Sequence, residues 1–183
     1  MVLTESFQVA LASGVKPFSL KGTDERAYTL ETFSDARILV VIFMCNHCPY
    51  IQACIDRLVA LQRDFADRSV RFVGINSNDS TDYPEDNFEA MQSFFIQKKM
   101  NFPYLHDMTQ QVARAYGAVC TPDIFVYDAE RKLQYHGRID NNWKDVSKVT
   151  SHELRDALEE LVNGRVSSSA QHPSMGCSIK WKD

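Results

Sequence analysis

The order of apolar and amphipathic segments predicts an α/β fold with a central mixed β-sheet flanked by helices. The segment at 38–44 is apolar without alternation, as expected of a strand that is covered on both faces. Apolar residues then recur at helical spacing from 48 to 67, and a second buried strand follows at 70–75. This order predicts a right-handed βαβ unit. Two strands and a helix near the end of the chain predict a ββα unit.

Turn and cap residues set the remaining boundaries. Thr109 and Ser151 are expected to cap two helices at their N-termini, and Gly117 and Asn163-Gly164 are expected to end them. The expected elements, in order, are a hairpin or extended lead-in at 17–33, a strand at 38–44, a helix at 48–67, a strand at 70–75, an inserted helix at 88–99, a strand at 102–105, a helix at 109–116, hairpin strands at 124–127 and 133–139, and a helix at 151–162.

A chain of 183 residues is expected to form one domain that needs neither disulfides nor metal to fold. We assign residues 1–166 to this domain, including an N-terminal extension. The rest of the chain, 167–183, is a tail that is expected to pack on or near the domain. Its beginning lies in a serine-rich linker at 166–170.

Charge and composition exclude several classes of partner. The net charge is −4 and there is no cluster of Lys and Arg, so neither nucleic acid nor an anionic membrane is expected as a partner. The first 16 residues have neither a basic start nor an apolar stretch long enough for a secretory signal or a membrane span. We therefore expect a cytoplasmic protein. Five cysteines in a reducing compartment favour catalytic or metal use over structural bridges.

The segment Cys45-Asn46-His47-Cys48 lies where the first long strand ends and a helix begins. Unpaired N–H groups and partial positive charge at a helix N-terminus lower the pKa of a nearby thiol. Because Cys45 precedes the helix and Cys48 is expected inside its first turn, we predict Cys45 as the solvent-facing thiol of low pKa and Cys48 as the shielded one. His47 either tunes this couple when protonated or is a solvated loop residue.

These features together resemble the thioredoxin superfamily over about residues 15–165. The resemblance rests on the βαβ and ββα order, on Cys-x-x-Cys after the first long strand, and on Thr121-Pro122 before the hairpin. It implies a thioredoxin-like fold with Cys45 as the attacking cysteine, Cys48 as the resolving one, a cis Pro122 facing both, and a Thr121 backbone that binds an extended substrate. Further motifs resemble a peroxiredoxin-like branch, namely those at 107–110, 115–118, 120–123 and 176–182.

The chain departs from the patterns of the families that it resembles at three places. Met44 replaces the tryptophan that thioredoxins carry before the first cysteine. No carboxylate lies within 38–44, so another base, Asp123 or water, would have to accept the proton of the resolving thiol. The Pro-x-x-x-Thr-x-x-Cys pattern of peroxiredoxins is also absent, because Val41 and Cys45 stand where Pro and Thr would be needed. That absence argues against efficient direct reduction of peroxide.

The function predicted first is that of a thiol-disulfide oxidoreductase with a redox-active Cys45/Cys48 disulfide. Its substrates would be protein or small-molecule disulfides, and its reductant an external thiol of the thioredoxin, glutaredoxin or glutathione type. No cofactor and no metal are expected, and a homodimer is left open. The alternatives are a thiol-dependent peroxidase and a metal-binding module formed by Cys45, His47, Cys48 and a further cysteine.

The other cysteines and histidines have separate predictions. Cys54 shares a helical stripe with apolar residues and is expected in the core. Cys120 and Cys177 are candidates for additional redox thiols, the first beside the cis proline and the second in a tail that can dock. The remaining histidines have no partner at catalytic spacing and are expected at the surface, namely His106, His136, His152 and His172.

Overall fold

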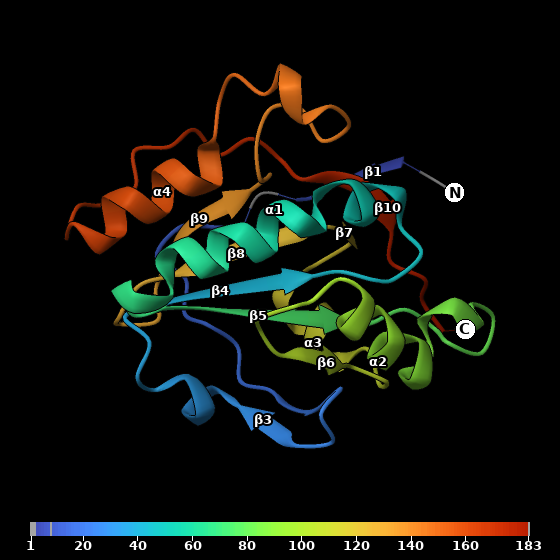
Figure 1. Ribbon diagram of the computed structural model, residues 1–183. Helices are drawn as coiled ribbons and strands as arrows, with labels where there is room; N and C mark the ends of the chain where they lie inside the picture. The colour runs from blue at the N-terminus through green and yellow to red at the C-terminus, as the bar shows by residue number, and fades with distance from the viewer. Residues whose placement is uncertain (1–2, 8, 183) are drawn as a thin grey trace.

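The computed structural model describes residues 3–7 and 9–182 (Figure 1). Its centre is a seven-stranded sheet in the order β3-β2-β6-β5-β4-β8-β9. β4 is parallel to β5 and antiparallel to β8, so the sheet is mixed, as predicted. The strands are β2 (Ser19–Gly22), β3 (Ala27–Thr29), β4 (Ile38–Phe43), β5 (Val70–Asn76), β6 (Tyr104–His106), β8 (Asp123–Tyr127) and β9 (Leu133–Gly137).

Helices cover both faces of this sheet. Every residue of β4 is buried, because alternate side chains enter two separate cores. Val40 and Ile42 belong to the core beneath α1, α2 and α4, whereas Leu39 and Val41 belong to the core beneath α3 and the N-terminal segment. The helices are α1 (Pro49–Phe65), α2 (Phe88–Gln97), α3 (Gln111–Tyr116) and α4 (Glu153–Val162), with 3-10 turns η1 (Leu30–Phe33), η2 (Ala66–Arg68), η3 (Pro84–Asp86) and η4 (Val146–Lys148).

A second, three-stranded sheet joins the two ends of the chain to the centre. Its antiparallel order is β1 (Leu3–Glu5), β10 (Met175–Ser178) and β7 (Cys120–Thr121). Neither β1 nor β10 was expected from the sequence. In Figure 1, β10 lies beside β7 and near the start of α1. Within the described ranges, no helix is long and apolar enough to cross a membrane.

Two predicted helix caps are wrong and two helix ends are confirmed. The residue before α3 is Gln110, at φ 62°, and the carboxylate of Asp107 accepts the N–H of Ala113 at 3.0 Å in place of a cap from Thr109. α4 begins after His152, and the backbone of Ser151 is held by Asn141 at 3.2 Å. In both loops, another side chain, that of Asp107 or of Asn141, accepts the backbone N–H near the start of the helix. The helices end, as predicted, at Gly117 and Asn163-Gly164.

Candidate active site

The two cysteines of Cys-x-x-Cys lie between the end of β4 and the start of α1. Cys48 is the N-cap residue of α1, and Pro49 occupies the first helical position, where no N–H is needed. Cys45 is 1% exposed and Cys48 is not exposed at all. The prediction that Cys45 faces solvent is therefore wrong. Both thiols are buried beneath the segments that surround the junction.

Thr121 contacts both thiols. The hydroxyl of Thr121 lies 3.4 Å from the sulfur of Cys45, and the sulfur of Cys48 lies 3.1 Å from the carbonyl oxygen of Thr121. The Thr121-Pro122 peptide bond is cis. The prediction of a cis proline within contact distance of the cysteine pair is thus confirmed.

The pKa values of the two thiols are opposite to the predicted order. A hydrogen bond from Cys45 is the main cause that lowers the pKa of Cys48 to about 5, and hydrogen bonds from Thr121 and from the backbone of Ile51 and Cys177 add to it. The pKa of Cys45 is raised well above its usual value by its hydrogen bond to Cys48, by burial and by the charge of Asp86. The start of α1 adds to the difference, because the backbone N–H of Ile51 also lowers the pKa of Cys48.

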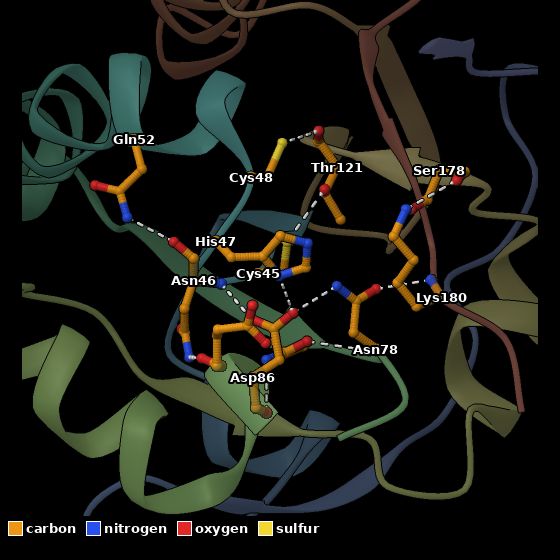
Figure 2. A network of polar contacts seen from close by, with 12 residues as sticks. Cys45, Asn46, His47, Cys48, Gln52, Asn78, Asp86, Thr121, Ser178 and Lys180 are labelled. Carbon is orange, nitrogen blue, oxygen red and sulfur yellow. Dashed lines mark hydrogen bonds and ion pairs between the residues drawn. The ribbon is translucent and has the colours of Figure 1, made fainter. Parts of the chain in front are cut away.

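A buried carboxylate, Asp86 of η3, organises the loop that carries the cysteines (Figure 2). It accepts hydrogen bonds from the Asn46 backbone at 2.7 Å, the Asn78 side chain at 2.7 Å and His47 Nδ1 at 2.6 Å. His47 also stacks on Tyr83 at 5.7 Å between ring centroids. The hydrogen bond to Asp86 raises the pKa of His47. Burial alone would raise the pKa of Asp86, but the hydrogen bonds from His47 and Asn78 outweigh it and lower that pKa. His47 is accordingly half of an ion pair, and not a solvated residue.

Sequence reasoning missed Asp86 and proposed Asp123 as the base. Asp123 instead forms a buried ion pair with His136, with 2.8 Å between Oδ1 and Nε2, and His136 stacks on Phe125 at 4.2 Å. His136 is therefore a core residue, contrary to the prediction, because its position in β9 faces Phe125 across the strand pair. The order of the strands was the signal that could have identified Asp86. Asp86 lies in the loop after β5, and the carboxyl ends of the parallel strands β4 and β5 lie at the same edge of the sheet.

The three other cysteines differ in their surroundings. Cys54 is buried in the core, as predicted, and burial raises the pKa of its thiol to about 12. The thiol of Cys120 points to the carbonyls of Pro122 and Ser174, at 3.6 and 3.8 Å, and burial raises its pKa. Cys177 pairs with Thr121 in the second sheet. The prediction that the backbone of Thr121 is open to a substrate strand is therefore wrong.

The structure brings together three residues of metal-ligating type, although not the set foreseen. The ligand atoms of Cys45, His47 and Asp86 lie within 4.8 Å of one another. Two ligands of one tetrahedral zinc, each at about 2.0–2.1 Å, would be about 3.3 Å apart. The His47 and Asp86 atoms are only 2.6 Å apart, which is the distance of a hydrogen bond. The arrangement is that of an ion pair beside a thiol.

Comparison with known proteins places these features in a family. The model of the AhpC/TSA family matches residues 12–136. A hypothetical protein from Sinorhizobium meliloti 1021 has 37% identity and a TM-score of 0.94, with 98% of each chain covered. An uncharacterized conserved protein from Geobacillus kaustophilus has 39% identity and a TM-score of 0.94, covering 100% of this chain and 97% of the other.

A more distant structure supports the fold alone. The thioredoxin domain of a thiol-disulfide oxidoreductase from Bacteroides vulgatus has 17% identity and a TM-score of 0.59, covering 69% of this chain and 86% of the other. Comparison with curated protein sequences gave no match. The fold is thioredoxin-like, and the chain belongs to the AhpC/TSA family.

Proposed function

We propose that the protein is a thiol-disulfide oxidoreductase in which Cys48 is the nucleophile and Cys45 the cysteine that closes the disulfide. The observation that supports it most is the position of Cys48 at the N-cap of α1, with a pKa lowered to about 5 and in hydrogen-bond contact with a second thiol. At neutral pH, Cys48 is then a thiolate, which is the form that attacks disulfides. These roles are the reverse of those predicted from the sequence.

The reaction follows from the contacts around the pair. The thiolate of Cys48 attacks one sulfur of the substrate disulfide, the S–S bond breaks, and one substrate thiolate leaves. Cys45 then attacks the sulfur of Cys48 and expels the second substrate thiolate. The proton of Cys45 must pass to a base, and the candidate is the carboxylate of Asp86, which has an oxygen within 4.8 Å of the Cys45 sulfur. An external thiol of the thioredoxin, glutaredoxin or glutathione type would reduce the disulfide again.

The test is a redox titration with disulfide mapping. The reduced protein is equilibrated in glutathione buffers of graded potential, quenched with acid and mapped by mass spectrometry. We expect a Cys45–Cys48 disulfide in the wild type and its loss in Cys45→Ser and Cys48→Ser. Cys54→Ser removes a buried thiol from the same helix and is the matched control. A wild-type protein in which Cys45 and Cys48 stay reduced at every potential would refute the proposal.

Peroxide reduction is the second candidate, and one observation favours it. Both thiols are almost fully shielded, so a small oxidant reaches them with less rearrangement than a protein disulfide does. The AhpC/TSA match is compatible with this reaction. Cys48 would become a sulfenic acid, and a second thiol would form the disulfide with loss of water. Stopped-flow oxidation of the reduced protein by hydrogen peroxide, compared with oxidised glutathione and a disulfide-bonded protein, discriminates between the two functions.

A further inference from the structure

The edge of β7 next to Pro122 is occupied by the chain's own C-terminal strand. β10 is antiparallel to β7, with Cys177 opposite Thr121. The two backbones are so close that a Cβ on Gly176 would lie 1.9 Å from the carbonyl oxygen of Thr121. A thioredoxin-like protein is expected to receive an extended substrate at this edge by strand addition. In this chain, β10 therefore takes the place of a substrate strand.

The pairing brings Cys177 to the thiol of Cys48. Thr121 lies opposite Cys177 in the β10–β7 pair, and the carbonyl oxygen of Thr121 is 3.1 Å from the sulfur of Cys48. Cys48 and Cys177 belong to the same buried cluster. Cys177 is only 3% exposed, so it faces the active site and not the solvent. The hydroxyl of Thr121 lies 3.4 Å from the sulfur of Cys45. Cys45, from the loop before α1, and Cys177, from the C-terminal strand, thus lie in the same buried cluster as Cys48.

Contacts on both sides of Cys177 hold the strand in position. Before it, the hydroxyl of Ser174 donates to the carbonyl of Gly137 at 2.7 Å. After it, the carbonyl of Lys180 accepts from the side chain of Gln110 at 2.7 Å. Figure 2 shows Ser178 and Lys180 of this segment on the side of the site opposite Gln52. Because the strand is fixed at both ends when it is docked, the docked tail presents its thiol to Cys48.

We propose that Cys177 is a second resolving cysteine, which β10 presents to Cys48 as a substrate strand would present its own cysteine. The proposal rests on the proposed function, since it requires a mixed disulfide on Cys48. A low-molecular-weight disulfide RSSR is attacked by Cys48, which releases RS⁻ and leaves Cys48–S–S–R. The thiol of Cys177 gives its proton to the RS⁻ released first, attacks the sulfur of Cys48 and expels the second RS⁻, which takes a proton from water. RSSR is reduced to two thiols, and Cys48 and Cys177 are oxidised to a disulfide.

The experiment isolates Cys177 by removing its competitor. Reduced Cys45→Ser is mixed with one equivalent of oxidised glutathione, quenched with acid at increasing times and mapped by mass spectrometry. We expect a Cys48–Cys177 disulfide and no lasting glutathione adduct. Cys45→Ser/Cys177→Ser should keep glutathione on Cys48 at least about tenfold longer, because a thiol held in contact acts at an effective concentration of millimolar or more. Cys45→Ser/Cys54→Ser, the matched control, should behave as Cys45→Ser does.

Two results would overturn the proposal, and they differ from each other. If Cys45→Ser and Cys45→Ser/Cys177→Ser retain glutathione on Cys48 equally long, Cys177 has no resolving role, while the nucleophilic role of Cys48 stands. If neither variant ever carries glutathione or a disulfide at Cys48, the proposed function fails together with this inference. Near-UV circular dichroism of each variant checks that the fold is retained.

Discussion

Gly176→Ala should open the active site without unfolding the protein. A Cβ at this position would lie 1.9 Å from the carbonyl oxygen of Thr121, whereas ordinary contact begins at 3.4 Å, so β10 has to move by about 1.5 Å (3.4 − 1.9). If the shift breaks two backbone hydrogen bonds of the β10–β7 pairing, at about 0.5–1.5 kcal/mol each, the docked state loses about 1–3 kcal/mol. The undocked population then rises about 5- to 150-fold, because each 1.4 kcal/mol is a factor of ten.

The assay is the rate at which iodoacetamide alkylates Cys48, followed by mass mapping. Since Cys48 is fully shielded, alkylation requires the tail to open, and the rate follows the open population. At the same pH, Cys48 of Gly176→Ala should be alkylated about 5- to 150-fold faster than Cys48 of the wild type, the same factor by which the open population rises. Gly14→Ala is the matched control, because a Cβ there has no atom within 4 Å. An unchanged rate in a folded Gly176→Ala protein would show that the β10–β7 contact does not close the site.

Three further predictions concern charge. The pH profile of Cys48 alkylation should have its inflection near 5 in the wild type. Cys45→Ala should raise this inflection, because it removes the hydrogen bond that is the main cause of the low pKa. An inflection above about 8 in the wild type would mean that Cys48 is an ordinary thiol. Thr121→Val keeps the shape and loses the hydroxyl that helps to lower the pKa of Cys48, so the inflection should again rise, and no change would assign that role elsewhere. Asp86→Asn should destabilise the protein by about 3 kcal/mol, because it breaks a buried ion pair with His47. The raised pKa of His47 gives stability that is full below about 6.5 and is lost as pH rises through the folded pKa, and the lowered pKa of Asp86 gives stability that is lost as pH falls below about 3.8. The difference between wild type and variant in urea denaturation should therefore be largest between about pH 4 and 6.5, and a difference that keeps growing above pH 8 would contradict this reasoning.

The framework of the fold was predictable because its elements carry strong local patterns. The uninterrupted apolar residues of β4 and the helical repeat of α1 identify the βαβ unit, and the Cys-x-x-Cys then falls at its junction. The roles of the two thiols depended on a finer detail. The sequence pattern starts the helix at Cys48, whereas α1 begins at Pro49. This difference of one residue, which is within the usual uncertainty of a helix boundary, makes Cys48 the N-cap residue. The lower pKa of Cys48 depends mainly on its hydrogen bond from Cys45, a contact that residue spacing does not reveal.

The parts that the sequence did not reveal are held by contacts between distant residues. β10 contains Gly176, Cys177 and Ser178, which give no pattern of a strand, and its partner β7 lies more than fifty residues earlier. Asp86 is in a polar loop without periodicity and reaches the cysteines only because β4 and β5 end side by side. In both cases, the fold has to be complete before the residue has a partner. Local propensity does not identify such contacts, although the order of the parallel strands places the loop of Asp86 at the edge of the sheet where the cysteines lie.

Ionisation of Cys48 and docking of the tail are coupled through shared hydrogen bonds. The backbone of Cys177 helps to lower the pKa of Cys48, and it does so only while β10 is paired with β7. Asn78 donates to Asp86 at 2.7 Å and accepts the Lys180 N–H at 2.9 Å, so the carboxylate that raises the pKa of Cys45 is also connected to the tail. Because linkage is reciprocal, a docked tail that favours the thiolate is itself held more tightly by the thiolate. Alkylation of Cys48 removes that charge, and with it one of the interactions that keep the tail closed over the site.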